Sequence, residues 1–291
     1  GDFMDHLKAY FSDVGGLDKI LGNSVTGGKL MGKVITPLMR KNIKNMAENF
    51  IAGETIDDGV KTFEKLHKNG LACSIDLLGE AVISEKEAEG FVQAYHEALQ
   101  KISRAANKWG KAGYPEEDAI GPIARTNVSV KLTALYEHVD PKAHQHSVDE
   151  LSKRFAALLD TAMEHNAYIH IDTEQYHLVP ITLDVMRNVL LDEKYKDWPH
   201  VGIVCQAYLR DGEEILDAII NLAQERGTPI SIRLVKGAYW DFEQAYAEQM
   251  NWPCPVFDEK EDTDYNFEKL THKLINAFPT VRPCIGSHNA R

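Results

Sequence analysis

Two patterns of apolar and polar residues alternate along most of this chain. Short apolar runs rich in β-branched residues are typical of buried strands, and six such runs occur, at 71–78, 127–135, 167–172, 200–208, 230–235 and 283–289. Longer segments whose apolar residues recur with helical spacing lie between them, for example at 148–166, 181–191, 213–226 and 267–277. Alternating strands and helices, with strands that are apolar on both faces, predict a parallel sheet of the α/β class.

The first 65 residues follow a different, mainly helical pattern. Apolar residues at positions 31, 34, 35, 38 and 39 recur with helical spacing, and basic residues at 33, 40 and 44 line the opposite side. We expect residues 1–65 to form an N-terminal helical arm that packs onto the main domain; the alternative is a basic amphipathic helix at a membrane surface. Another helix is expected to begin after Thr55 and to end near Gly70, a residue type common at helix C-termini.

Polar residues recur where the predicted strands end. They are Asp76 and Glu80, Lys131, Asp172, Gln206, Arg233 and Lys236, and His288. In a closed (βα)8 barrel such positions meet at the mouth, where active sites lie. No Gly-x-Gly-x-x-Gly follows any strand, which weakens the alternative of an open, doubly wound sheet. We therefore predict a TIM-type (βα)8 barrel over residues 66–291, distorted and C-terminally incomplete, with about six of the eight units before the chain ends at Arg291.

The composition is that of a soluble globular protein. The apolar content is 44%, charged residues make up 26%, and the net charge of −12 argues against a nucleic-acid binder. No apolar run approaches the length of a bilayer span and no signal-peptide pattern is evident, so we expect a cytoplasmic protein. The four cysteines are far apart in sequence. Free thiols, buried at Cys73, Cys205 and Cys284, are expected, with disulfides as the alternative.

Residues 229–243 combine a strand with unusual charges. Arg233 and Lys236 lie at the carboxyl end of the apolar run, although an unpaired interior charge is costly. Gly237 follows, and an aromatic helix start comes next. Cations at a strand end before a helix N-terminus can hold an anion or an electron-rich ring. The alternative is a strand whose charges emerge at the surface.

Six motifs, in order, resemble the proline dehydrogenase family, and specifically the barrel of the bifunctional proline utilization A flavoenzymes. They are Asp-Leu-Leu-Gly-Glu at 76–80, Val-Ser-Val-Lys-Leu at 128–132, Ile-Asp at 171–172, Gln-Ala-Tyr at 206–208, Ile-Arg-Leu-Val-Lys-Gly-Ala-Tyr-Trp-Asp at 232–241 and Gly-Ser-His-Asn at 286–289. The resemblance implies a distorted (βα)8 barrel with non-covalent FAD. It also implies oxidation of L-proline to Δ1-pyrroline-5-carboxylate by hydride transfer to flavin N5, with electrons passed to a membrane quinone.

The resemblance assigns the substrate side of the site to four residues. Lys131 matches the cation for the proline carboxylate, and Tyr239 would line the proline site. Asp172 matches an active-site aspartate that orients neighbouring groups. Glu80 matches a glutamate that closes the pocket through an arginine on the last barrel helix. Taken singly, Lys131 could equally be a lysine at a strand end that points to solvent, and Glu80 a solvated glutamate at a helix start.

The cofactor side is assigned to ten residues. Arg233 matches an arginine near flavin N5, where a cation stabilises the reduced ring, and Gln206 matches a partner of the isoalloxazine edge. The others are Thr173 beside the flavin, Lys236, Gly237 and Ala238 along the ribityl–phosphate chain, Trp240 against adenine, and Ser287, His288 and Asn289, where the family has Thr-His-Asn. Isolated residues of these types are otherwise structural.

Two alternative functions stay open. The family pattern Tyr-x-x-Arg-Arg-x-x-Glu-Asn, whose arginines clamp the proline carboxylate, does not occur in residues 1–291, so a truncated barrel that binds ligand without turnover is one alternative. The other is a metal-dependent hydrolase barrel that uses His170, Asp172 and His288; for the flavoenzyme we expect no metal. The remaining expected partners are a quinone, peripheral contact with the inner membrane, and a downstream aldehyde dehydrogenase module.

Overall fold

The computed structural model describes residues 51–79, 82–111 and 113–288. The predictions for the helical arm before residue 51, for Glu80 and for Asn289 lie outside these residues. Residues 54–291 form one compact unit, which includes the helix that we predicted after Thr55. The division of the chain into an arm of residues 1–65 and a barrel of residues 66–291 stays a prediction.

Six parallel strands form one sheet, and their spatial order is their order in the chain. They are β1 (Ile75–Asp76), β2 (Thr126–Lys131), β3 (Ala167–Asp172), β4 (Val201–Gln206), β5 (Ile230–Val235) and β6 (Val281–Ile285). A doubly wound sheet reverses its strand order at a switch point, and this sheet has no reversal. The predicted alternation of parallel strands and helices is confirmed, whereas closure into a barrel stays a prediction.

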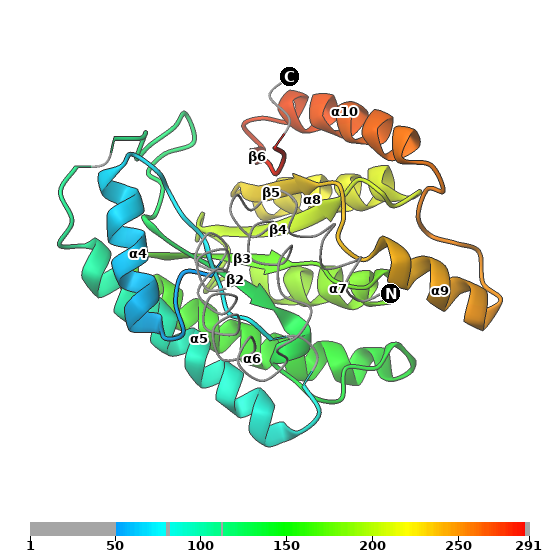
Figure 1. Cartoon of the computed structure of the whole chain (residues 1–291), viewed down its shortest axis with the longest axis horizontal. Coiled ribbons are helices and arrows are strands. Elements are labelled where there is room, and N and C mark those ends of the chain that lie inside the picture. The colour runs from blue at the N-terminus through cyan, green and yellow to red at the C-terminus, as the bar shows by residue number, and fades with distance from the viewer. Residues whose placement is uncertain (1–50, 80–81, 112, 289–291) are drawn as a thin grey trace, which may run out of the picture. The chain divides into compact units, whose positions relative to one another are not determined.

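Helices connect successive strands and lie around the outside of the sheet (Figure 1). They are α4 (Ile56–Lys68), α5 (Glu85–Ala106), α6 (His144–His165), α7 (Val179–Leu190), α8 (Gly212–Arg226), α9 (Trp240–Met250) and α10 (Lys260–Asn276), with 3-10 turns at Leu132–Ala134, Pro141–Ala143 and Tyr176–Leu178. None of the helices in the described part of the chain has the length and apolar character to cross a membrane.

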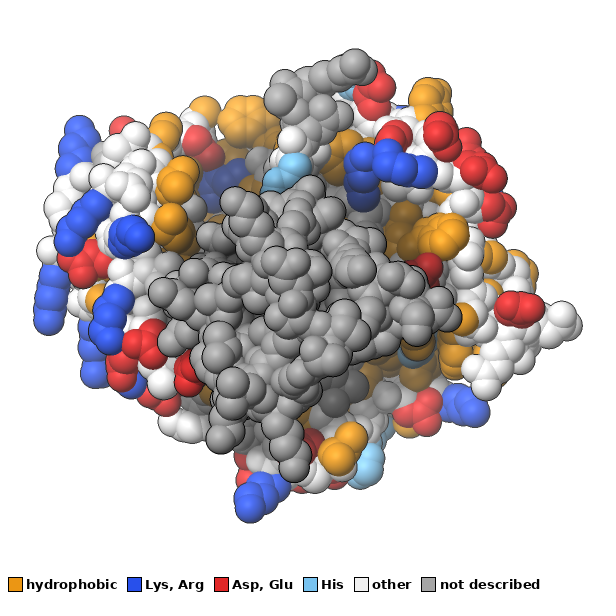
Figure 2. Space-filling view, viewed as in Figure 1, with side chains coloured by type: hydrophobic (Ala, Val, Ile, Leu, Met, Phe, Trp, Pro, Cys, Tyr) orange, Lys and Arg blue, Asp and Glu red, His pale blue; other side chains and the backbone are white. Residues whose placement is uncertain are grey.

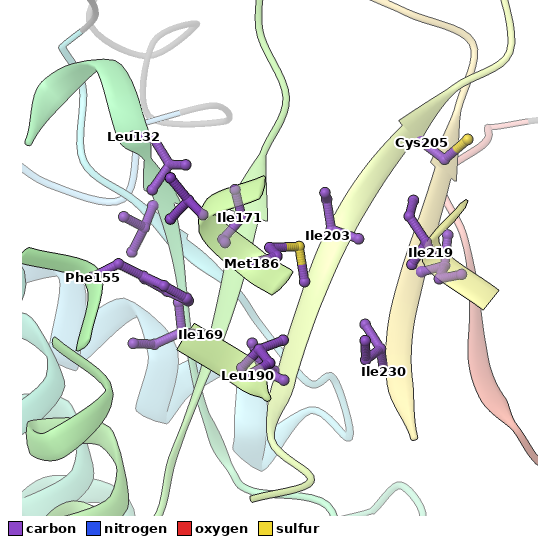
Figure 3. Close-up of a cluster of buried hydrophobic side chains, with 14 of the residues drawn as sticks. Leu132, Phe155, Ile169, Ile171, Met186, Leu190, Ile203, Cys205, Ile219 and Ile230 are labelled. Atoms are coloured by element: carbon purple, nitrogen blue, oxygen red, sulfur yellow. The ribbon is translucent and has the colours of Figure 1, made fainter. Parts of the chain in front are cut away.

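The apolar face of the sheet forms the core with these helices. Ile169 and Ile171 of β3 pair in register with Val201 and Ile203 of β4, so their side chains share one face. Figure 3 shows that face meeting side chains of the covering helices, among them Phe155, Met186, Leu190 and Ile219. Because every second residue of each strand points to this core, the intervening residues point to the opposite face of the sheet.

Capping residues read from the sequence explain where several helices begin and end. The Thr55 hydroxyl accepts a hydrogen bond from the Asp58 amide (3.2 Å) at the start of α4. Ser84 does the same for Glu87 (3.3 Å) at the start of α5. Gly70 follows α4 with a φ of +77°, a backbone conformation that glycine adopts without a Cβ penalty. The predicted stop of this helix near Gly70 is thereby confirmed.

The first strand is shorter than predicted. The apolar run at 71–78 predicted a full strand, but only Ile75 and Asp76 pair with β2. Leu71 and Leu78 are 54% and 77% exposed, so the outer part of this run has no core to cover. The cysteines are all free as predicted. Only Cys205 is fully buried, because Cys73 and Cys284 lie near the exposed ends of β1 and β6 and are half-buried.

A buried histidine should make stability depend on pH. His200 is 5% exposed, its ring meets Trp198 edge-on, and its Nδ1 has no hydrogen-bond partner among the described residues. Burial, aided by the positive charge of Arg282, lowers the pKa of His200 to about 4. Between the usual pKa of about 6.5 and this value, the unfolded chain binds a proton that the folded chain does not. Stability therefore falls as the pH drops through this window.

Urea unfolding between pH 7 and pH 4 tests this expectation. In His200→Phe, which keeps an aromatic ring and cannot titrate, the slope of unfolding free energy against pH should decrease by up to about 1.4 kcal/mol per pH unit. His272 is an exposed histidine of α10, and His272→Phe serves as the control. Equal slopes of unfolding free energy against pH for the wild type and His200→Phe would contradict the assignment of this pH dependence to His200.

Candidate active site

A cavity of about 580 Å³ opens where the six strands end. Each strand or the segment just after it contributes lining residues: Asp76, Lys131, Asp172 and Thr173, Gln206, Arg233 to Tyr239, and Gly286 to His288, with Leu234 excepted. Ligand pockets are typically about 300–1,000 Å³, so this volume suits a small molecule or part of a cofactor. The convergence of strand-end polar groups that the sequence predicts is therefore present.

Four charged side chains, from β1, β2, β3 and β5, contact one another in the wall of the cavity. Lys131 Nζ lies 2.6 Å from Asp76 Oδ1 and 3.9 Å from Asp172 Oδ2. Arg233 Nη1 donates to Asp172 Oδ1 (3.1 Å), and its Nη2 donates to Ser129 Oγ (3.0 Å). Lys131 and Asp172 are register partners on β2 and β3, which places them side by side. Asp172 is consequently held between two cations.

The pKa of Asp172 reflects two opposing effects. Burial raises it above the usual value for aspartate, whereas the positive charges of Arg233 and Lys131 lower it; the nearby Asp76 carboxylate adds to the increase. The net direction is upward. Because an isolated buried carboxylate is costly, its ionised form depends on both cations. The Asp172 carboxylate on β3 can therefore hold the side chain of Arg233 on β5 in a fixed orientation, although β4 lies between these two strands.

Hydrogen bonds that involve backbone groups fix three residues of the cavity wall. The Lys131 amide donates to the hydroxyl of buried Tyr95 (3.3 Å). Gln206 is 3% exposed, and its Nε2 donates to the Glu174 carbonyl (3.0 Å). Thr173 Oγ1 donates to the Val204 carbonyl (3.4 Å). These bonds connect the ends of β3 and β4, so the loop after β3 is held beside the cavity.

The turn between β5 and α9 requires glycine. Gly237 has a φ of +132°, and a Cβ at this position would lie 2.5 Å from the Tyr208 ring. Gly286, after β6, is similarly close, since a Cβ there would lie 2.9 Å from Val235 Cγ1. Lys236 forms an ion pair with Asp264 beside this turn. The backbone of Gly237 and Ala238 thereby lines the cavity without a large side chain in front of it.

The structure brings most, but not all, predicted site residues together. Trp240 does not line this cavity; it is 38% exposed, and its Nε1 donates to the Phe257 carbonyl (2.8 Å). Ser129 was not predicted, although it lies two residues before Lys131 and so faces the same side of β2. The position of Ser129 two residues before Lys131 was the sequence signal that could have identified it as a site residue.

The histidine of the alternative metal site lies deeper than the cavity. His170 is 2% exposed, its ring stacks on Tyr168, and it packs over Gly202, where a Cβ would lie 2.6 Å from the ring. Burial lowers the pKa of His170 to about 3. Across residues 51–288, apart from the undescribed positions 80, 81 and 112, no group of three or more His, Cys, Asp or Glu residues is arranged to hold a metal ion.

Comparisons with known proteins agree on one family. The family model described as proline dehydrogenase matches residues 59–291. The chain is 31% identical over 267 residues to bifunctional protein PutA from Klebsiella aerogenes, a match that covers 90% of this chain and 20% of that protein. It is 28% identical to proline dehydrogenase 1 from Bacillus subtilis, with 77% of this chain and 59% of that protein covered.

A solved structure is similar as well. It is that of proline utilization A from Bdellovibrio bacteriovorus, inactivated by N-propargylglycine. The TM-score is 0.85 with 37% identity, covering 88% of this chain and 27% of that chain. This chain thus spans about a fifth to three fifths of the length of these curated relatives.

Proposed function

This chain belongs to the proline dehydrogenase family, and we propose that it oxidises L-proline to Δ1-pyrroline-5-carboxylate with FAD as its cofactor. One observation carries the proposal. Lys131, Gln206, Arg233 and His288, which the resemblance assigned to a single site, line one cavity although they are separated by up to 157 positions in the chain. We also propose that the six strands are part of a distorted (βα)8 barrel.

The residues of this cavity fit a flavin dinucleotide. Arg233 and Lys236 supply positive charge, and Gly237 packs closely against the Tyr208 ring and also lines the cavity. The turn leads directly into the N-terminus of α9, which favours a phosphate group. We propose that the ribityl–phosphate chain is held by residues 236–238, and the ring by Arg233, Gln206 and Thr173. Ser287, His288 and Asn289 complete the cofactor site, with Trp240 on the adenine.

The flavin, when bound, supplies the acceptor for the hydride that leaves the proline carbon next to nitrogen. Arg233 would hold the flavin ring and supply a fixed positive charge beside it. Asp172 orients Arg233 through the 3.1 Å hydrogen bond. We propose that Lys131 binds the substrate carboxylate, which would take the place of the half-exposed Asp76 carboxylate on Lys131 Nζ. Tyr239 lines the proline site, and Glu80 closes it.

Turnover by the chain itself tests the proposal. With FAD added, the folded chain should reduce a soluble quinone in the presence of L-proline but not of D-proline. N-propargylglycine, which inactivated the Bdellovibrio protein, should inactivate this chain over time. A folded, FAD-saturated chain without L-proline-dependent quinone reduction would contradict the proposal. Cytoplasmic location, peripheral contact with the inner membrane, transfer of electrons to a membrane quinone and a downstream aldehyde dehydrogenase module belong to the same proposal.

Loss of the Lys131 charge should weaken substrate binding. Lys131→Met keeps the length of the side chain and removes the charged hydrogen bond, so the KM for L-proline should rise about 10- to 100-fold, the equivalent of a charge-assisted hydrogen bond. The matched control is Lys142→Met, at an exposed position far from the cavity lining, whose KM should match the wild type. An unchanged KM in Lys131→Met would show that another group binds the carboxylate.

A further inference from the structure

A second cavity, of about 430 Å³, lies on the other side of the loop after β3. It is bordered by that loop, the loop after β4, helix α9 and residues 252–255. Among the residues that the structure describes, none lines both this cavity and the candidate active site. Its volume falls within the range of about 300–1,000 Å³ that is typical of small-molecule sites. The cavity is thus large enough for a ligand of its own.

Two carboxyl groups joined through Tyr176 line one side of this second cavity. Asp211 Oδ2 accepts a hydrogen bond from the Tyr176 hydroxyl (2.7 Å), and Glu243 Oε1 accepts one from the Tyr176 amide (2.7 Å). Glu243 is 2% exposed, and burial raises its pKa. These contacts hold both carboxyl groups in fixed positions and leave one acidic oxygen unused.

The unused oxygen is Asp211 Oδ1. It is buried and has no hydrogen-bond partner among the described residues; the same holds for His177 Nδ1 in the cavity wall. A buried polar atom without a partner costs about 1–3 kcal/mol. Asp211 lines the cavity, and its negative charge has no cationic partner among the described residues, so a ligand with a positive charge would offset it.

Aromatic rings form the opposite side of the second cavity. His177 packs on Tyr246 with ring centroids 5.4 Å apart, and Trp252 meets Tyr246 edge-on at 5.9 Å. Figure 2 shows hydrophobic side chains at the surface in the region that α9 occupies in Figure 1, and Trp252 is 54% exposed there. Aromatic faces attract cations, and the attraction is stronger when the cation is desolvated.

The basic residue of the wall is already occupied. Arg210 Nη2 lies 2.8 Å from Asp258 Oδ2, and its Nε donates to the Cys254 carbonyl (3.2 Å). Its positive charge is therefore balanced outside the cavity. The remaining charged groups of the lining are Asp211 and Glu243, so the electrostatics favour a cation and disfavour an anion.

We propose that this second cavity is a binding site for a small organic ammonium ion with an apolar body. The ammonium group pairs with the carboxylate of Asp211, and the body lies against Tyr246 and Trp252. The site is independent of the proposed proline oxidation, because it shares no lining residue with the candidate active site.

Calorimetric titration of the full chain with benzylammonium tests the proposal. Benzylammonium should bind at least tenfold more tightly than benzyl alcohol, and benzoate should not bind. Asp211→Asn, which removes the charge but keeps the shape, should weaken benzylammonium binding at least tenfold. Trp252→Ala, at an exposed position that the fold tolerates, should weaken it as well and covers the case in which Asp211→Asn does not fold.

Two control variants separate this site from others. Glu214→Gln removes an exposed acidic group from α8, outside the cavity lining, and should bind benzylammonium as the wild type does. Arg233→Ala alters the candidate active site and should also leave this binding unchanged. Equal binding of benzoate, wild-type affinity in both Asp211→Asn and Trp252→Ala, or loss of binding in Arg233→Ala would each overturn the proposal.

Discussion

Arg233→Ala should lower the rate of flavin reduction by L-proline about 10²- to 10³-fold, the effect typical of removing one preorganised electrostatic group. The guanidinium bonds Asp172 and Ser129 at the same time, so its position is fixed before the substrate arrives. Its removal also leaves the Asp172 carboxylate with Lys131, at 3.9 Å, as its remaining cation at the site. Stopped-flow measurement at saturating FAD and L-proline separates this effect from weaker binding.

Arg233→Lys is the informative companion variant. Lysine keeps the charge, but its single ammonium group cannot reproduce the planar, two-pronged contact with Asp172 and Ser129. We expect a rate between those of the wild type and Arg233→Ala. Thermal unfolding of each variant checks that the fold persists. A reduction rate within threefold of the wild type in Arg233→Ala would remove this residue from the catalytic account.

Gly237→Ala should abolish FAD binding and destabilise the fold by about 2–6 kcal/mol. The added Cβ would lie 2.5 Å from the Tyr208 ring, and a φ of +132° is strained for any residue with a Cβ. Overpacking and backbone strain each cost about 1–3 kcal/mol. The turn can relieve the clash only by moving the backbone that lines the cavity. Urea unfolding and FAD titration measure the two effects.

Gly90→Ala is the matched control. Gly90 lies in α5 at an exposed position, and a Cβ there would contact nothing within 4 Å. Alanine in a helix interior is favoured over glycine by about 0.5–1 kcal/mol, so this variant should be as stable as the wild type or more so. Tyr208→Ala combined with Gly237→Ala should destabilise the fold by less than the sum of the two single changes, because the clash is removed while the strained φ remains. Wild-type stability and FAD affinity in Gly237→Ala would contradict the steric argument.

The sequence predicted the strands best where both faces are buried. The runs at 167–172 and 230–235 coincide with β3 and β5, whose residues are mostly buried on both faces. At 71–78 the same pattern misled, since β1 pairs on one side and its outer leucines are exposed. Periodicity reports how apolar a segment is, whereas the extent of a strand also depends on the partners it meets.

The candidate site was predictable as a set of strand ends but not as a set of contacts. The pairing of Lys131 with Asp76, across 55 positions, and of Arg233 with Ser129, across 104, depends on which strands become neighbours. The hydrogen bond from the Trp240 indole to the Phe257 carbonyl is a further contact that the sequence did not predict. The second cavity has no local sequence signal at all, because Asp211, His177 and Trp252 meet only through the folding of three loops.

Anaerobic titration of the FAD-loaded chain with L-proline, followed by visible absorbance, tests the central claim most directly. That claim is that strand-end cations and amides surround one redox-active ring. The proposal predicts a yellow protein whose flavin absorbance bleaches with L-proline and persists with D-proline. A folded chain that retains FAD but does not bleach would support the alternative of binding without turnover, and one that retains no FAD would contradict the flavoenzyme account altogether.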